Sequence, residues 1–202
     1  MFLIRQPDTV GIRNFIQDRG PLPFNYKETG WTKTGKTPRG YNLDRDALQV
    51  GSGADGFERA KKYLNQWRMF SLDWTKLCWP FKRITAGSTV AVLALHYGFW
   101  SINCARVVYV IDEPRLFAFA YGTVSDHAAR GEERFQIEWR EDDTVWYDIQ
   151  SFSRPNHWLV YLGYPLARGL QKKFRTDSIR AMINAMAGQP IGGPSLEVGR
   201  DL

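Results

Sequence analysis

One histidine, two glutamates and one arginine lie close together in the second half of the chain: His127, Glu132, Glu133 and Arg134. Carboxylates and an imidazole can hold a metal ion, and they can also exchange protons with a bound molecule. Glu132 and Glu133 are adjacent, and adjacent residues of a strand point to opposite faces, so only one of them can face a given site. A polar turn between two strands accounts for the same residues without chemistry.

The glutamate that points inward needs a partner, because an unpaired buried carboxylate is costly. The candidate partners are Arg106, Arg154 and Arg168. A pair between the inward glutamate, Glu132 or Glu133, and one of these arginines inside an aromatic cavity would mark a functional site, and a purely structural ion pair accounts for it equally well. Tyr121 is a further candidate, because a tyrosine on a cavity wall offers an apolar ring and a hydroxyl that can orient a ligand.

Other catalytic and cofactor patterns are missing from the sequence. Cys78 and Cys104 have no CxxC spacing, and the three histidines have neither the HExxH pattern nor a separation of four residues. No glycine-rich phosphate loop follows a predicted strand, and no serine stands in a GxSxG turn. We therefore expect neither a metal nor a cofactor.

The composition is that of one folded domain with many aromatic residues. The 202 residues are 44% hydrophobic and 24% charged, which is ordinary for a globular protein, but 14% are Phe, Trp or Tyr. Aromatic side chains fill large cores and also line ligand cavities, so this share fits either arrangement. We expect a single domain over residues 1–202.

The charge pattern limits the partners and the location. The net charge is +6, but the Lys and Arg residues are spread along the chain rather than grouped, so we expect no specific nucleic-acid binding. No apolar run reaches the eighteen residues of a membrane span, and Arg5, Asp8 and Arg13 interrupt any secretion signal. Two cysteines are too few for a disulfide scaffold, so these features favour a cytoplasmic protein. The oligomeric state does not follow from the sequence.

In the first third of the chain, the pattern predicts two helices and two strands. Asp8 can cap a helix over 9–18, and a second helix from Asp55 to about residue 66 places its apolar residues on one face. Weak alternation predicts strands over 24–29 and 41–50.

The middle of the chain reads as one strand after another. Short acidic turns separate alternating or continuous apolar runs, which is typical of an antiparallel meander. A turn or bend is expected over 98–103. The predicted strands cover 77–81, 89–96, 104–112, 116–124, 132–141 and 144–154.

A long helix closes the sequence. Leu162, Leu166 and Leu170 continue a four-residue spacing that begins at Trp158 and is typical of an amphipathic helix. Pro165 suits a first helical turn, so we expect a short leading turn over 157–162 and then a helix of about 22 residues. The Gly- and Pro-rich residues 188–202 are expected to form a flexible tail.

These elements predict an α+β fold, in which a curved antiparallel sheet grips the long C-terminal helix. Three short sequence motifs support this fold by resemblance: FAYGT from Phe119, GEERF from Gly131 and FSRP from Phe152. Over about residues 24–186, the chain resembles the uncharacterised family called domain of unknown function nineteen-ninety. The resemblance implies the helix-grip architecture of START and polyketide-cyclase-like proteins, and it implies no established activity.

Three functions remain open on this fold. The first is the binding of a small apolar or lipid-like ligand in a cavity between the sheet and the helix. The second is an enzyme of the cyclase, isomerase or hydrolase type that uses Glu132 or Glu133 with Tyr121, His127 and Arg154. The third is an interaction protein with a filled core whose basic surface docks an acidic partner. The ligand-binding candidates are Arg106, Phe119, Tyr121, Glu132, Phe135, Tyr147, Phe152, Arg154, Leu166 and Leu170.

Overall fold

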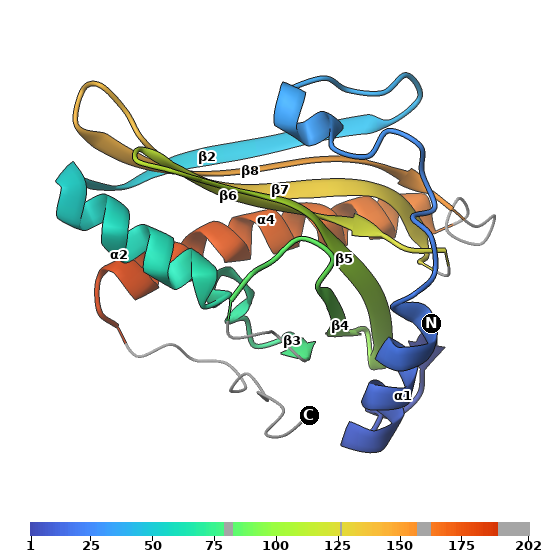
Figure 1. Ribbon diagram of the computed structural model, residues 1–202. Helices are drawn as coiled ribbons and strands as arrows, with labels where there is room; N and C mark the ends of the chain where they lie inside the picture. The colour runs from blue at the N-terminus through green and yellow to red at the C-terminus, as the bar shows by residue number, and fades with distance from the viewer. Residues whose placement is uncertain (79–82, 126, 157–162, 190–202) are drawn as a thin grey trace.

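The computed structural model describes residues 1–78, 83–125, 127–156 and 163–189. Within them, seven strands form one antiparallel sheet in the order β2-β8-β7-β6-β5-β4-β3, and the short β1 pairs with β5. The sheet curves around two helices, α2 and α4, which lie on its concave side (Figure 1). The strands are β1 (Phe2–Leu3), β2 (Asn42–Ser52), β3 (Thr75–Cys78), β4 (Thr89–His96), β5 (Phe99–Glu113), β6 (Leu116–Thr123), β7 (Ala129–Trp139) and β8 (Thr144–Pro155).

The described residues contain three α-helices, α1 (Thr9–Arg19), α2 (Gly53–Asn65) and α4 (Tyr164–Met186). The Asp8 carboxylate accepts the backbone N–H of Gly11 over 2.8 Å and so caps α1. Pro165 lies in the first turn of α4, where a backbone N–H is not needed. Two short 3-10 helices, Trp31–Thr34 and Arg68–Phe70, complete the described helical structure.

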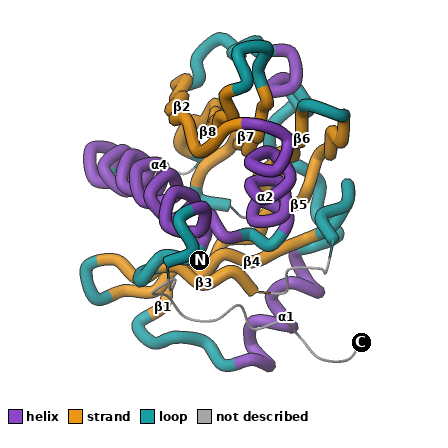
Figure 2. Tube along the Cα trace, turned by 90° about the vertical axis from the view of Figure 1, so that its left-hand side faces the viewer, coloured by secondary structure: helices purple, strands orange, loops and turns teal. Residues whose placement is uncertain are grey.

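Strand β5 makes the sheet bend, because its two halves pair with different neighbours. Residues 99–106 pair with β4, and residues 105–113 pair with β6, with a register shift between Val107 and Tyr109. A bulge of this kind increases the local twist of a strand. As a result, the β3–β4 end of the sheet turns away from the β2–β8 end, and α2 and α4 lie between the two ends (Figure 2).

The hydrophobic core fills the space between the concave face of the sheet and the helices. Phe119 and Phe135 stack on neighbouring strands with ring centroids 5.3 Å apart, and Trp67 meets Phe119 edge-on at 4.9 Å. Tyr147 is fully buried, and its hydroxyl lies 2.8 Å from the Ser178 hydroxyl of α4. The contact between Tyr147 and Ser178 attaches the C-terminal half of α4 to the sheet.

The segment from Phe24 to Gly40 covers the opposite, convex face of the sheet (Figure 1). It begins at an isolated bridge between Phe24 and Val124, and it then forms the 3-10 helix Trp31–Thr34 above β7. Because this segment lies outside the sheet, side chains that point away from α4 are buried as well.

The predicted fold class and most of its elements are confirmed. The sheet is antiparallel, β4 covers the predicted 89–96, and α4 begins one residue before Pro165. Residues 24–29 form a loop with one bridge instead of a strand. The bend predicted over 98–103 is wrong, because β5 starts at Phe99, directly after the turn at Tyr97 and Gly98.

One further prediction differs from the structure, and two lie outside its described part. Helix α2 starts at Gly53, with Ser52 as its N-cap, and Asp55 lies in its first turn. The leading turn over 157–162, including Trp158 and Leu162, and the tail from residue 190 lie outside the described residues. The single domain over residues 1–202 stays a prediction.

Candidate functional site

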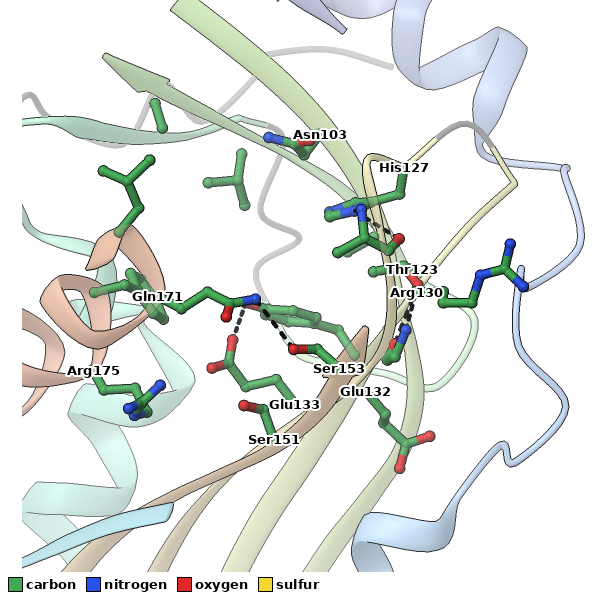
Figure 3. Close-up of a pocket in the computed structure, with 18 of the residues that line it drawn as sticks. Asn103, Thr123, His127, Arg130, Glu132, Glu133, Ser151, Ser153, Gln171 and Arg175 are labelled. Atoms are coloured by element: carbon green, nitrogen blue, oxygen red, sulfur yellow. Dashed lines mark hydrogen bonds between the residues drawn. The ribbon is translucent and has the colours of Figure 1, made fainter. Parts of the chain in front are cut away.

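A hollow of about 240 Å³ lies between the inner face of the sheet and the first half of α4. Strands β4 to β8 form its walls on one side, and α4 forms the other side (Figure 3). Large apolar side chains from the sheet, from the helices and from the turn before β3 line it. Among these are Phe70, Trp74, Val92, Tyr121, Leu170 and Phe174.

Glu133 of β7 is the carboxylate that faces this hollow. The Tyr121 hydroxyl donates to Glu133 Oε2 over 2.5 Å. The other carboxylate oxygen, Oε1, has no hydrogen-bond partner among the described residues. Ser151 and Ser153 of β8 point to the same side and lie beside Glu133 (Figure 3). The carboxylate therefore has one free oxygen next to open space.

Burial raises the pKa of Glu133 to about 7, because removal from water disfavours the charged form. The hydrogen bond from Tyr121 and the positive charge of Arg175 oppose this rise, while the negative charge of Asp44 adds to it. Burial and the nearby Glu133 also raise the pKa of Tyr121 well above its usual value. At neutral pH, Tyr121 thus keeps its proton, and Glu133 exists in both forms.

A chain of polar contacts attaches α4 to the sheet beside the hollow. Gln171 donates to the Ser153 hydroxyl over 3.1 Å, and Arg168 donates to Gln171 over 2.8 Å. Arg168 also donates to both oxygens of Asp44, over 2.5 and 2.6 Å. Burial alone would raise the pKa of Asp44, but the hydrogen bonds from Arg168 and the charge of Arg175 lower it.

Arg175, which also lines the hollow, is held by two carboxylates. It lies 3.2 Å from Asp44 and 2.6 Å from Asp46, both on β2. The positive charges of Arg168 and Arg175 are balanced by the negative charges of Asp44 and Asp46. The cationic side of α4 is therefore neutralised by β2 rather than directed at the hollow.

A second hollow, of about 590 Å³, adjoins the first at the N-terminal end of α4. The two share lining residues, among them Asn103, His127, Leu170 and Gln171. Large apolar side chains border the second hollow and are exposed: Tyr97 is 69% accessible, Phe99 55% and Leu166 49%. The described residues thus outline a path from the surface to Glu133.

His127 lies where the two hollows meet. Its Nδ1 accepts the backbone N–H of Ala129 over 3.0 Å. Burial lowers the pKa of His127 to about 4, so its imidazole is neutral at physiological pH. In this state it offers a polar but uncharged group at the passage between the hollows.

Glu132 lies on the convex face of the sheet, and its carboxylate points away from the hollow (Figure 3). Its Oε2 accepts the Tyr26 hydroxyl over 2.9 Å and the Gly30 N–H over 2.7 Å. Its Oε1 accepts the Thr32 N–H over 3.1 Å and the Thr32 hydroxyl. Glu132 therefore anchors the segment that covers the sheet.

Six of the ten predicted ligand-binding residues line a hollow: Tyr121, Glu132, Phe152 and Leu170 line the first, and Arg154, Leu166 and Leu170 line the second. Phe119, Phe135 and Tyr147 face the same side of the sheet but are buried in the core, beyond the end of the hollow. For these three, tight packing against α2 and the second half of α4 leaves no space.

Four of the predicted residues make their side-chain contacts on the convex face of the sheet, although three of them also line a hollow. Arg106 donates to the Leu22 carbonyl and lies 4.9 Å from the centre of the Phe24 ring. Phe152 packs on Tyr26 and Tyr41, although its strand passes the first hollow. Arg154 lies 4.5 Å from the centre of the Tyr41 ring. Glu132, described above, is the fourth.

Strand alternation explains this split. On β7, Glu133 and Phe135 share the inner face, so Glu132 must point outward. On β8, Tyr147 and Ile149 face inward, and the same alternation continues to Ser151 and Ser153, which the prediction missed. Counting in steps of two from Tyr147 would have found both serines.

The structure gives no sign of a metal site or a membrane span within its described part. Residues 1–78, 83–125, 127–156 and 163–189 contain no group of three His, Cys, Asp or Glu side chains placed to hold a metal ion. Within the same ranges, no helix combines the length and the apolar character needed to cross a membrane.

Comparisons with known proteins assign the chain to a family. Residues 25–181 match a family described as Domain of unknown function (DUF1990). A relative from Dictyostelium discoideum, named UPF0548 protein, is 35% identical over 207 residues, which cover 92% of this chain and 96% of the relative.

Two solved structures share the fold at low sequence identity. A START superfamily protein from Mycobacterium smegmatis has a TM-score of 0.54 at 16% identity, over 74% of this chain and 99% of that chain. The di-domain ARO/CYC StfQ from the steffimycin biosynthetic pathway has a TM-score of 0.55 at 9% identity, over 73% of this chain and 52% of that chain. The fold is therefore the helix-grip fold of START-like proteins, and the chain belongs to the DUF1990 family.

Proposed function

We propose that this protein binds a small, largely apolar molecule between the sheet and α4, with the polar group of that molecule against Glu133. The observation that carries the proposal is the free oxygen of a deeply placed carboxylate beside a hollow of about 240 Å³. Burying a carboxylate with a single hydrogen-bond donor destabilises a fold, and a structural role would favour further donors. A ligand that occupies the hollow supplies the missing contact.

The walls of the hollow suit an apolar body. Phe70, Trp74 and Phe174 present rings, and Val92 and Leu170 add aliphatic surface. Each apolar Å² that a ligand removes from water contributes about 25 cal/mol, so contact with such walls favours binding without any specific bond. The second hollow gives a longer ligand room to extend towards the exposed Leu166.

Native mass spectrometry of freshly purified protein, followed by solvent extraction, tests the proposal. We expect a defined extra mass and an apolar compound in the extract. Leu170→Trp should abolish the extra mass, because Leu170 lines both hollows and the larger ring fills the space between them. Ile183→Trp is the matched control, since this side chain lies on the same helix, is 39% exposed and lines neither hollow.

The parent protein and both variants should melt at similar temperatures. If the parent carries no extra mass and takes up no added apolar probe, the proposal fails. The interaction protein with an acidic partner is then the better reading. A cytoplasmic location stays part of the proposal, in line with a sequence that has only two cysteines, both of them buried.

A second function is proton transfer to or from the bound molecule, as in an isomerase or cyclase. The observation that favours it is the pKa of Glu133, which at about 7 is matched to general acid–base chemistry near neutral pH. Glu132 lies on the other face, and the low pKa of His127, about 4, makes its imidazole a weak base, so Glu133 with Tyr121 would act without them. The test is deuterium incorporation into the extracted ligand in D2O: incorporation by the parent but not by Glu133→Gln supports an enzyme, and none in either excludes this step.

A further inference from the structure

We infer that the polar group of the ligand is a protonated amine, which binds between the free oxygen of Glu133 and the aromatic wall of the inner hollow. This inference rests on the proposed function and adds the chemical class of the ligand. Three observations carry it: the charges around the hollow, the nature of its walls and the unused acceptors beside Glu133.

The charges around the hollow favour a cationic ligand over an acidic one. Among the described residues that line it, Arg175 is already bound by Asp44 and Asp46, and Arg130 points away from the space (Figure 3). Arg130 instead donates to the side chain of Asn156. A ligand carboxylate would therefore meet Glu133 without a cation to balance it, and two carboxylates at one site repel each other.

The walls beside Glu133 suit a cation. Phe70, Tyr121 and Phe174 form a cluster in which the ring centroid of Phe70 lies 6.3 Å from that of Tyr121 and 5.1 Å from that of Phe174. The faces of aromatic rings attract cations, and the attraction increases where water is excluded. Such rings together with one carboxylate are a common way to bind an ammonium group.

The unused acceptors match the donors of an ammonium group. Glu133 Oε1 has no hydrogen-bond partner among the described residues, and the same holds for the Ser151 side chain, which lies beside it (Figure 3). An ammonium group has only donors, so it can satisfy both acceptors together. Tyr121 donates to Oε2 and keeps the carboxylate oriented towards the hollow.

A matched set of probes tests the inference: decylamine, decanol and decanoate, which differ only in the polar end. Binding of each is measured by isothermal titration calorimetry at about pH 8, where Glu133 is mainly ionised. We expect decylamine to bind at least about tenfold more tightly than decanoate, because a charge-assisted hydrogen bond replaces a repulsion. Decanol should fall between the two.

The variant Glu133→Gln should remove this preference and bring decylamine and decanoate to within about threefold of each other. Glu138→Gln is the matched control, because it removes the same charge from the same strand at an exposed ion pair with Arg140. It should keep the preference of the parent. Decanoate binding as tightly as decylamine, or a preference that survives Glu133→Gln, overturns the inference. No binding of any probe counts against the proposed function itself.

Discussion

Glu132 and Glu133 are adjacent on β7, yet their carboxylates accept different numbers of hydrogen bonds on the two faces of the sheet. On the convex face, Glu132 accepts hydrogen bonds from Tyr26, Gly30 and Thr32, so both carboxylate oxygens are fully used. On the concave face, Glu133 accepts one hydrogen bond, from Tyr121, and its other oxygen borders a hollow. Glu132 thus has a structural role, whereas Glu133 remains available to a ligand.

The difference shows how a binding residue can be told from a structural one. Burial alone does not separate them clearly, because Glu132 is buried and Glu133 is also partly buried. The number of donors does: a carboxylate with a full set of backbone and hydroxyl donors is a structural anchor, and one with an unused oxygen beside open space is directed at a ligand. The predictions below test this distinction.

The largest expected effect is the loss of stability in Glu132→Gln. The amide keeps one acceptor oxygen and places an NH2 group against the donors of Gly30 and Thr32, and an unsatisfied buried donor costs about 1–3 kcal/mol. We expect the free energy of unfolding to fall by about 3 kcal/mol in a urea titration. Glu133→Gln should change it by less than about 1 kcal/mol near pH 5, where Glu133 is already protonated.

Equal losses in these two variants would refute the distinction between the faces. Circular dichroism before the titration shows whether Glu132→Gln still folds. If it does not, Thr32→Val provides a milder test, because it removes only the hydroxyl contact to Glu132 and the contact to Tyr109.

The second prediction is a pH dependence caused by Glu133. Its pKa is about 7 in the folded state and near 4.5 when unfolded, so the folded protein binds more protons between these values. Stability should therefore decrease as pH rises from about 4.5 to about 7, by roughly 3 kcal/mol in total, and the decrease should be absent in Glu133→Gln. The measurement is the free energy of unfolding of both proteins from pH 4 to 8.

His127 should oppose this trend in the parent protein. Its pKa falls from an ordinary 6.5 to about 4 on folding, so its contribution to stability is complete above 6.5 and is lost as pH falls towards 4. Between about pH 4.5 and 6.5 the two slopes have opposite signs. The difference between the parent and Glu133→Gln isolates the carboxylate. If the difference in the free energy of unfolding between the two proteins does not change across this range, the raised pKa of Glu133 is contradicted.

A smaller effect is expected from Gly122→Ala on β6. A Cβ at this position would lie 2.1 Å from the Tyr26 hydroxyl, which donates to Glu132. Tyr26 must move, so we expect a loss of about 2 kcal/mol from overpacking and from the weakened hydrogen bond. Gly169→Ala on α4 is the control: no atom lies within 4 Å of its Cβ position, and alanine should stabilise the helix by up to about 1 kcal/mol. A neutral Gly122→Ala would show that the covering segment is not fixed there.

The smallest effect concerns Tyr121. Its hydroxyl orients Glu133 from the inner face, and Tyr121→Phe removes this one hydrogen bond without opening a large space. We expect binding of decylamine to weaken by about 1 kcal/mol, or roughly fivefold, with little change in the melting temperature. If the affinity is unchanged, Tyr121 contributes only packing, and other contacts orient Glu133.

The sequence determines the elements and their order, because the patterns that specify them are local. Alternating apolar residues fix the strands β6 to β8, the Asp8 cap starts α1, and the spacing of Leu166 and Leu170 gives one face of α4. The opposite directions of Glu132 and Glu133 also follow from the sequence, since the side-chain period of a strand is two.

Only the tertiary structure decides which of the two glutamates is available to a ligand. The segment Phe24–Gly40 lies a hundred residues from Glu132 in sequence, and no local pattern predicts that it folds over the convex face and supplies the donors there. The ion pairs from Arg168 and Arg175 to β2 likewise join residues more than 120 positions apart. Side-chain direction is a property of each strand, whereas a hollow and its unused carboxylate oxygen depend on how distant segments pack against each other.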